Sequence, residues 1–310
     1  MVKAGSRLQL QENTLHHFNS YLYCYNINLI RDFCKEDVLD SSMFPKLFIK
    51  ELVGQLSFDF HTNASYYNNQ GRTVAISVNA AQDVVAFIIQ DIVAFYWKKN
   101  NPTIFYRRLP QATTELMNYW LVHIALPIFF SYQRTYFFLH AGAVLTADEK
   151  SIAFMAPCNG GKSTLTDYFL QQGHALVTDD KLGLLPEENH MLAVPSHPYQ
   201  RPYRAIETLG KCCANVAQKP SILQTIFILN PVASDANIHF TPLRGIDKFT
   251  QLRYGAEINY EFGITDETQH LSYIGNRVRM AKIDIPWDMQ RLPEVYDSIL
   301  KYTQSETHES

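Results

Sequence analysis

The segment SIAFMAPCNGGKSTLTDYFLQQG, residues 151–173, joins an apolar run, a loop with two glycines and a mixed polar and apolar stretch. The run at 151–156 predicts a buried strand, and the stretch from Thr164 to Gly173 predicts a helix that ends at a glycine. When a strand is followed by a Gly-Gly-Lys-Ser loop and then by a helix, the backbone N–H groups of the loop can point at an anion. The segment therefore predicts an α/β fold with a phosphate-binding loop at 156–164.

The residue types of the loop suit a nucleoside polyphosphate. Gly160 and Gly161 allow close backbone approach and positive φ angles, so that N–H groups can surround the phosphates. Lys162 is expected to reach the β and γ phosphates, and Ser163 to offer its hydroxyl to Mg²⁺. Thr164 is expected to begin the helix, whose dipole favours an anion. The predicted nucleotide-binding residues are Ala156, Pro157, Cys158, Asn159, Gly160, Gly161, Lys162, Ser163 and Thr164.

Two positions of the loop depart from the pattern G-x-x-x-x-G-K-[ST]. Ala156 replaces the leading glycine, and Asn159 stands where many such loops have another glycine. Alanine is the next smallest residue, and asparagine tolerates left-handed backbone geometry, so neither change disables the loop. The alternative is a chance Gly-Gly-Lys-Ser in an unrelated turn. Cys158 is interpreted as a small tolerated residue, with a redox-sensitive thiol as the alternative.

An acidic pair follows one predicted helix later, in LVTDDKLGLL at 176–185. Asp179 and Asp180 end an apolar strand, and ligands of α/β sheets gather at the carboxyl ends of the strands. One carboxylate can hold Mg²⁺, and the other can accept a proton from an attacking hydroxyl. Without the loop, two acids at a strand end would be read as turn residues.

The rest of the chain predicts two domains, 1–134 and 135–310. The first reads as an α+β module, with a hairpin turn at Asn68, Asn69 and Gly71 and core helices at 83–96 and 113–132. The second contains a strand at 136–145, YFFLHAGAVL, which precedes the loop segment. The histidines of the first domain, His16, His17 and His61, are interpreted as surface or structural residues.

Composition limits the class of protein. Hydrophobic residues make up 46% and charged residues 18% of 310 residues, which is typical of a globular protein, and the net charge of −3 does not favour nucleic-acid binding. Five cysteines without metal-type spacing indicate reduced thiols. The N-terminus lacks the apolar run of a secretory signal, and the apolar stretch 121–130 is too short to span a bilayer. A cytoplasmic protein without a membrane partner is expected.

The order of these motifs resembles a known family. A strand ending in Leu139, His140 and Ala141, then APCNGGKSTL at 156–165, LVTDDKLGL at 176–184 and VPSHPYQRPYRAIETLG at 194–210 is similar to the HPr kinase/phosphorylase superfamily. The resemblance is greater to the HPr kinase-related proteins encoded beside peptide natural products, some of which phosphorylate a serine of a lasso precursor peptide. The resemblance is specific over about residues 138–210, and the rest of the chain is similar only in outline.

The resemblance implies an HPr kinase/PEP carboxykinase-like P-loop kinase domain with a mixed sheet. It implies ATP and Mg²⁺ as cofactors, Asp179 as general base, Lys162 and Ser163 as phosphate and metal ligands, and Asp180 as an assistant at the metal. His140 matches an active-site histidine of the family, although a histidine at a strand end is often structural. Arg201 and Arg204 fall near a basic residue of the relatives and could neutralise the moving phosphoryl group; exposed arginines without a role are the alternative.

The same resemblance implies a peptide or protein substrate with an acceptor serine. No segment resembles the stretch that HPr kinase/phosphorylases use for oligomer contacts and phosphorolysis, so neither a hexamer nor the reverse reaction is expected. The protein-kinase sequences H-R-D and D-F-G and the guanine reader N-K-x-D are also missing from the chain. Two alternatives remain open, a kinase of a free metabolite and a nucleotide-gated binding protein whose first 130 residues recognise a partner.

Overall fold

The computed structural model describes residues 21–32, 45–54, 65–69, 72–79, 81, 83–157, 159–201, 207–256 and 267–305. These residues divide into two compact units, Met1–Leu121 and Val122–Ser310. The boundary predicted after residue 134 lies C-terminal to this division. Gly71, Cys158, Arg204 and the histidines at 16, 17 and 61 lie outside the described residues.

The first unit contains an eight-stranded sheet with the order β1-β2-β3-β8-β7-β6-β5-β4. The pairs β2–β3 and β3–β8 are parallel, and the other neighbours are antiparallel. Its elements are β1 (Tyr21–Cys24), β2 (Ile27–Arg31), β3 (Lys46–Glu51), β4 (Ser65–Asn69), β5 (Arg72–Val78), β6 (Val84–Ile89), β7 (Val93–Lys98), β8 (Thr103–Arg108) and helix α2 (Thr114–Trp120).

One predicted helix of this unit is wrong, and the predicted hairpin is confirmed. Residues 83–96 form the hairpin β6–β7, in which Ile89 faces Val93 across a turn that contains Asp91 at φ 62°. Valines and isoleucines have restricted side chains that favour strands, and Asp91 tolerates the left-handed turn. The hairpin after Asn69 is confirmed, since β4 and β5 pair with Asn69 opposite Arg72.

The predicted helix at 113–132 is confirmed, although it is interrupted. It consists of α2, a π-helical turn η1 (Leu121–Ala125) and α3 (Leu126–Tyr132), and the Thr113 hydroxyl accepts a hydrogen bond from the Leu116 N–H at its start. A π turn inside an α-helix is not visible in hydrophobic spacing. Within the described residues, none of the helices combines the length and the apolar composition that a bilayer crossing requires.

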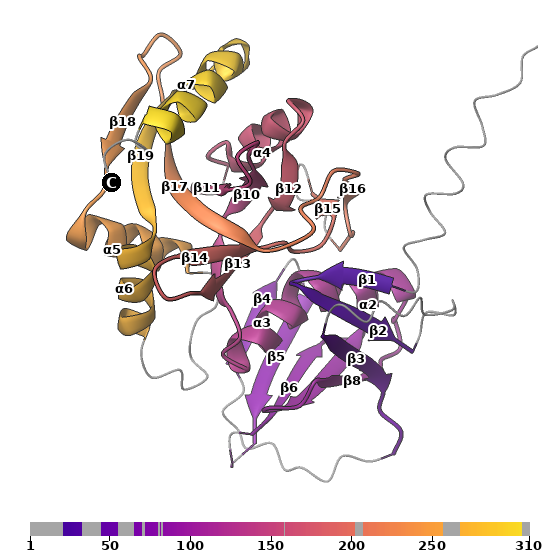
Figure 1. Cartoon of the computed structure of the whole chain (residues 1–310). Coiled ribbons are helices and arrows are strands. Elements are labelled where there is room, and N and C mark those ends of the chain that lie inside the picture. Colours follow the sequence, from indigo (N-terminus) through magenta and orange to yellow (C-terminus); the bar gives the residue numbers. More distant parts are fainter. Residues whose placement is uncertain are drawn as a thin grey trace, which may run out of the picture. The chain divides into compact units, whose positions relative to one another are not determined.

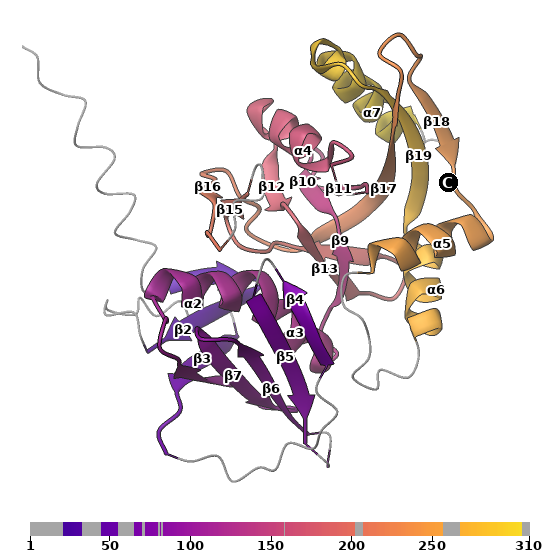
Figure 2. The ribbon, with the colours of Figure 1, turned by 180° about the vertical axis from the view of Figure 1, so that it is seen from behind.

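The second unit is a mixed α/β structure with helices on both faces of its sheet (Figures 1 and 2). Strands follow the order β12-β10-β11-β17-β14-β13-β9, and β19 pairs with both β17 and β18. Its elements are β9 (Phe137–His140), β10 (Gly142–Leu145), β11 (Ser151–Met155), α4 (Lys162–Gln171), β12 (Ala175–Thr178), β13 (Lys181–Pro186), β14 (Met191–Val194), β15 (Tyr199–Gln200), β16 (Lys211–Cys212), β17 (Ser221–Val232), β18 (His239–Pro242), α5 (Gly245–Gly255), α6 (Glu267–Arg277), β19 (Arg279–Pro286), η3 (Met289–Arg291) and α7 (Leu292–Ser305).

The central strands are buried on both faces, which explains their uninterrupted apolar sequences. In β11, Ile152 and Phe154 belong to the cluster that α4 and α7 cover, whereas Ala153 and Met155 belong to the cluster on the side of α5 and α6. Figure 1 shows α7 alongside the long strands β17 and β19. The predicted strand at 151–156 is confirmed as β11, which ends at Met155. The helix ending at Gly173, which has φ 94°, is also confirmed, but α4 begins at Lys162 and not at Thr164.

The predicted single strand at 136–145 is two strands. β9 pairs with β13, whereas β10 pairs with β11 and β12, and Ala141 separates them. The Ala141 N–H donates to the Asp180 carbonyl at 3.1 Å. A local change of partners of this kind depends on strands that come later in the chain, so the continuous apolar pattern does not reveal it.

Gly142 holds β10 against the start of α4. A Cβ atom at this position would lie 2.5 Å from Thr166 Oγ1 and 3.4 Å from both Lys162 Cγ and the Asp179 carbonyl. We expect Gly142→Ala to lower the free energy of unfolding by about 1–3 kcal/mol, because the added methyl overpacks a buried contact. Urea unfolding measures the difference.

Gly275→Ala is the matched control. Gly275 lies inside α6, and its added Cβ would be 3.5 Å from Leu252 Cδ1, an ordinary contact. Alanine is a better helix former than glycine, so this variant should be neutral or more stable by up to about 1 kcal/mol. Equal stability of the two variants would contradict the packing assigned to Gly142.

Candidate phosphate-binding site

The loop between β11 and α4 has the backbone geometry expected of a phosphate cradle. Asn159 has φ 62° and Gly161 has φ 89°, so the asparagine does occupy the left-handed region. Gly160 is required for a different reason: a Cβ there would lie 2.8 Å from Ala156 Cβ and 3.0 Å from the Pro157 carbonyl. The Gly160 N–H donates to that carbonyl at 3.0 Å, which closes the turn. The loop thus leads directly into the N-terminus of α4.

The acidic pair lies at the same edge of the sheet as the loop. β10 is antiparallel to both β11 and β12, so these two strands run in the same direction and end together. Asp179 and Asp180 follow β12, and the loop follows β11. Lys162 Nζ lies 3.4 Å from Asp180 Oδ1. The structure therefore brings the predicted lysine and carboxylates together.

Asp180 is surrounded by basic groups from four segments. Besides Lys162, its carboxylate lies 3.3 Å from His140 Nδ1, 3.7 Å from Lys181 Nζ and 3.7 Å from an Arg201 guanidinium nitrogen. Burial alone would raise the pKa of Asp180, but Lys181, Lys162, His140 and Arg201 together hold that pKa well below its usual range. Asp180 is consequently a permanent negative charge that holds the basic side chains together.

Asp179 has a different environment although it is the neighbouring residue. Its side chain is 5% exposed, and Oδ2 accepts a hydrogen bond from the Arg201 backbone N–H at 2.9 Å. Among the described residues, Oδ1 has no hydrogen-bond partner. Burial, with the charge of Asp180 adding to it, raises the pKa of Asp179 against the opposing effects of the Arg201 N–H and the nearby cations. Two acids whose pKa values are pushed apart are suited to different chemical roles.

Lys181 is a member of this site that sequence reasoning missed. It is 9% exposed and faces His140 across the β9–β13 pair. Its pKa is lowered to about 8, chiefly by burial; Lys162 and Arg201 act in the same direction, and Asp180 acts in the opposite one. The signal was present in the sequence, because a lysine directly after two acids interrupts an apolar strand.

Two buried histidines lie beside the charged cluster and were also missed. His123, in the π turn, has Nε2 3.1 Å from the Leu209 carbonyl, and its ring meets that of His197 edge to face at 4.3 Å. His197 Nδ1 accepts from the Tyr199 N–H at 3.3 Å. Burial, with the charge of Arg201, lowers the pKa of His197 to about 3, so this ring is neutral. Only tertiary structure brings residues 123 and 197 together.

Two cavities adjoin the loop. One of about 390 Å³ is lined by His140, Met155, Ala156 and Pro157 on one side and by Gln251, Tyr254 and Gly255 of α5 on the other. A second, of about 170 Å³, is lined by Gly160, Gly161 and Thr164 and by the segment after β19. The loop therefore has open space at both its beginning and its end.

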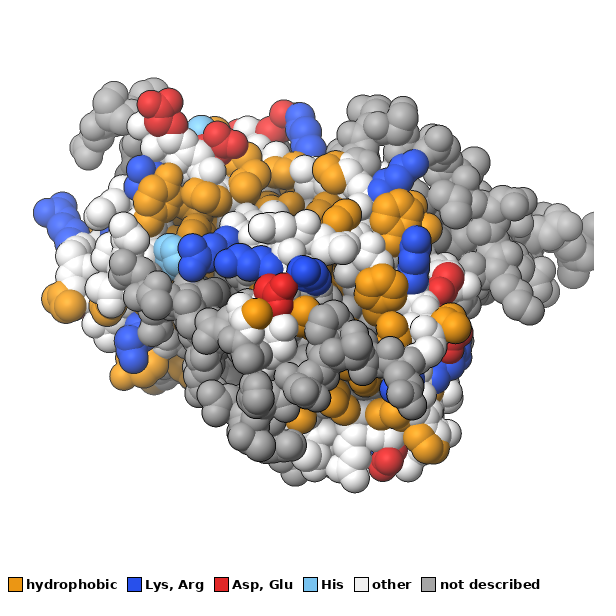
Figure 3. All heavy atoms as spheres, turned by 90° about the horizontal axis from the view of Figure 1, so that it is seen from below, with side chains coloured by type: hydrophobic (Ala, Val, Ile, Leu, Met, Phe, Trp, Pro, Cys, Tyr) orange, Lys and Arg blue, Asp and Glu red, His pale blue; other side chains and the backbone are white. Residues whose placement is uncertain are grey.

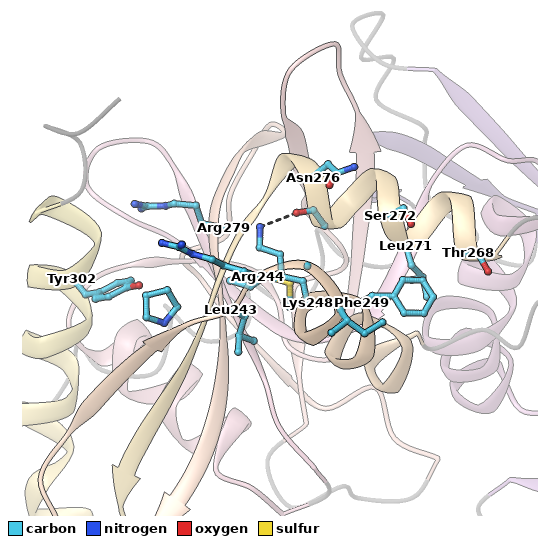
Figure 4. Close-up of a pocket in the computed structure, with 15 residues that line it drawn as sticks. Leu243, Arg244, Lys248, Phe249, Thr268, Leu271, Ser272, Asn276, Arg279 and Tyr302 are labelled. Atoms are coloured by element: carbon cyan, nitrogen blue, oxygen red, sulfur yellow. Dashed lines mark hydrogen bonds between the residues drawn. The ribbon is translucent and has the colours of Figure 1, made fainter.

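A larger cavity of about 800 Å³ lies between α5, α6 and β19, away from the loop (Figure 4). Figure 4 shows Arg244, Lys248 and Arg279 around it, with Lys248 bonded to the backbone of α6. Lys248 Nζ donates to the Gly275 and Val278 carbonyls, both at 2.8 Å, so the ammonium group binds carbonyls at the C-terminal end of α6.

On the face drawn in Figure 3, basic side chains lie in a short row beside an acidic one, so both signs of charge occur there.

Comparisons with known proteins add little. No family model matches the chain, and no curated protein matches it. A solved structure is similar in part. It is described as the HPr(Ser) kinase/phosphatase from Coxiella burnetii, with 15% sequence identity and a TM-score of 0.34, and the match covers 55% of this chain and 97% of that one. A likeness with this TM-score does not show a function for the chain.

The charge of Lys181 leads to a testable pH dependence. Because the pKa of Lys181 is about 8 in the folded protein and 10.5 ordinarily, the unfolded chain binds more protons between these values, and stability rises with pH in that window. We expect Lys181→Met to raise the free energy of unfolding at pH 7 by about 2 kcal/mol. The advantage should shrink above pH 8 and vanish near pH 10.5.

Lys219→Met serves as the control, since the Lys219 side chain is 72% exposed in an ion pair with Glu149. Its effect on stability should be small and independent of pH over the same range. Urea unfolding at several pH values measures both variants. A Lys181 variant that is less stable than wild type at pH 7 would show that the lysine is a net stabiliser.

Proposed function

We propose that this protein is an ATP-dependent kinase that transfers the γ-phosphoryl group to a hydroxyl, and that the hydroxyl belongs to a serine of a peptide or protein. The observation that carries the proposal is the meeting of a phosphate-type loop, Lys162 and two unlike carboxyl groups at one sheet edge. The order of motifs that resembles HPr kinase-related proteins supports the same reaction. We place this reaction in the cytoplasm, where ATP is available.

The electrostatics of the site suit a polyphosphate. Three basic side chains, Lys162, Lys181 and Arg201, adjoin Asp180, and when all three are protonated and both Asp179 and Asp180 are ionised the balance is three positive charges against two negative ones. The N-terminus of α4 adds a favourable dipole at the loop. Lys162, held by Asp180 in this structure, is in position to exchange that partner for a phosphate oxygen. The basic groups are gathered before the substrate arrives, so the main change on binding would be the exchange of partner by Lys162.

The residues present also fit Mg²⁺. Mg²⁺ takes one or two carboxylates and completes its shell with phosphate oxygens and water, and the ionised Asp180 with the Ser163 hydroxyl offers such a set. Among the described residues, no group of three or more His, Cys, Asp or Glu side chains could hold a metal ion. When bound, Mg²⁺ would neutralise charge on the phosphates.

Asp179 is the proposed general base. Its raised pKa makes it a better proton acceptor than Asp180, and the bond from the Arg201 N–H fixes its orientation while leaving Oδ1 for the substrate hydroxyl. His140 and the Arg201 side chain lie beside the carboxylates and are proposed to stabilise the charge that develops on the moving phosphoryl group. Positioning and electrostatics would supply most of the rate.

The acceptor is proposed to approach through the cavity of about 390 Å³ beside the loop. His140 and Ala156 belong to its wall, so a hydroxyl placed there would be near the end of the phosphate chain. Tyr254, which is 83% exposed, stands in the opposite wall. An exposed aromatic residue next to a concave site suits recognition of a peptide chain.

Asp179→Asn tests the mechanism. The amide cannot accept the proton, so the rate of transfer to the acceptor should fall by at least about a hundredfold. Affinity for MgATP, measured by calorimetry, should change little, because Asp179 is not proposed to contact the nucleotide. A variant that transfers at the normal rate would refute the assignment of the base.

Asp297→Asn is the control, because Asp297 is an exposed acid on α7 and far along the chain from the loop. It should leave both transfer and binding unchanged. Lys162→Met, by contrast, should weaken MgATP binding at least tenfold, because it removes the side chain proposed to reach the phosphates. Together the three variants separate a loss of chemistry from a loss of binding.

Incubation of the protein and γ-labelled ATP with cell extract identifies the class of acceptor. Label in a peptide or protein, removed by a serine-directed phosphatase, is the expected result. Label in a small molecule would instead show a metabolite kinase. ATP binding without transfer to any component would show a nucleotide-gated binding protein.

A further inference from the structure

A tryptophan beside the phosphate loop is exposed in a way that packing does not explain. All three tryptophans of the chain lie in described ranges; Trp97 and Trp120 are 1% and 0% exposed, whereas Trp287 is 59% exposed. Trp287 follows β19 directly, and Met289, which is 68% exposed, comes two residues later. Large apolar side chains exposed next to a concave surface indicate a binding site.

The position of Trp287 is fixed by its backbone. Its N–H donates to the Val232 carbonyl at 3.0 Å, which ties it to the end of β17. On its other side, the Asp288 carboxylate accepts from the Gln290 N–H at 2.9 Å and begins the short helix η3. Arg291 then bonds to the Ser234 and Ala236 carbonyls. The indole is therefore presented by a rigid support.

The indole stands directly over the loop. Its Cζ3 atom is 3.4 Å from the position that a Cβ of Gly161 would occupy. The ring forms part of the cavity of about 170 Å³, whose other walls come from the loop and α4, from the ends of β17 and β19, and from the start of α7. The lining is mostly apolar: Gly160, Gly161, Thr164, Leu165, Leu229, Pro231, Ile285, Pro286, Trp287, Asp288, Met289 and Leu292.

The direction of the phosphate chain along the loop indicates which part of the nucleotide would occupy this cavity. Lys162 is paired with Asp180 and does not line the cavity, so the terminal phosphate belongs on the side of the carboxylates. The nucleoside must then leave the loop on the side of Gly161 and Thr164. That side opens to Trp287, and the cavity is smaller than the roughly 300–1,000 Å³ of pockets for whole drug-sized ligands, which suits one planar ring system.

We propose that this cavity binds the nucleobase of the nucleoside triphosphate and that Trp287 is the surface on which the base stacks. This inference rests on the proposed function, because it assumes that the loop holds the phosphates. Stacking of a base on an indole needs an exposed ring, and Trp287 is 59% exposed on a backbone that is hydrogen-bonded to the end of β17. Met289 and Pro286 supply apolar contacts at the edge of the same space.

Inorganic tripolyphosphate separates the base from the phosphates. Calorimetry with magnesium ATP and with magnesium tripolyphosphate is compared for wild type and for Trp287→Ala. The substitution should weaken ATP binding about tenfold, as expected for the loss of one base–aromatic stack, and change tripolyphosphate binding less than about twofold. Trp287→Phe should retain most of the affinity for ATP, because it keeps an aromatic face.

Ile246→Ala is the control, since Ile246 is also a large apolar side chain, 72% exposed, on α5 outside the cavity. It should leave both affinities unchanged. If Trp287→Ala weakens both ligands equally, or neither, the nucleobase site is refuted while the kinase proposal stands. If wild type binds neither ligand, the phosphate loop itself is refuted, and the proposed function fails together with this inference.

Fluorescence gives an independent readout without a substitution. Since the other two tryptophans are buried, a collisional quencher such as iodide should reach mainly Trp287. ATP should shield it from iodide, and tripolyphosphate should not. Equal shielding by both ligands would assign the effect to the phosphates and contradict stacking.

Discussion

The ionised carboxylate of Asp180 is the constraint on which the site depends. Its contacts draw together side chains from α4, β9, β13 and the end of β15, namely Lys162, His140, Lys181 and Arg201. Without a negative charge there, mutual repulsion would drive these basic groups apart. The carboxylate is available because β11 and β12 end at the same sheet edge, so an acid after one strand meets a lysine in the helix that follows the other.

The same arrangement lowers the free energy of unfolding. Lys181 is buried deeply enough that its pKa falls to about 8, so at neutral pH the fold carries a charge that burial disfavours. Asp179 is buried with one oxygen that has no hydrogen-bond partner among the described residues. Buried ionisable groups that cost stability are characteristic of sites shaped by function. An incoming substrate hydroxyl would supply the contact that Asp179 Oδ1 lacks, and a polyphosphate would add a partner to Lys181, which already contacts Asp180.

Three parts of the candidate site adjoin the loop at different positions. The cavity of His140, Ala156 and Tyr254 lies at the beginning of the loop, the carboxylates lie beside Lys162, and the cavity of Trp287 adjoins Gly161. The first cavity, the carboxylates and the second cavity would suit an acceptor, a phosphate chain and a base, in that order. The two glycines of the loop have different roles, since Gly161 adopts a positive φ angle and Gly160 allows close packing on Ala156.

Local signals in the sequence determined the strand, loop and helix at 151–173, the acids at a strand end and the helix at 113–132. These signals are apolar spacing, glycine geometry and a capping threonine, and each depends only on residues that are neighbours in the chain. The hairpin at 84–98 was mistaken for a helix because a run that is apolar on every side has no clear period. Only tertiary structure decided the partners of Asp180, the break at Ala141, the meeting of His123 with His197 and the place of Trp287 over Gly161. These contacts join residues far apart in the chain, and strand order, which no local pattern encodes, brings them together.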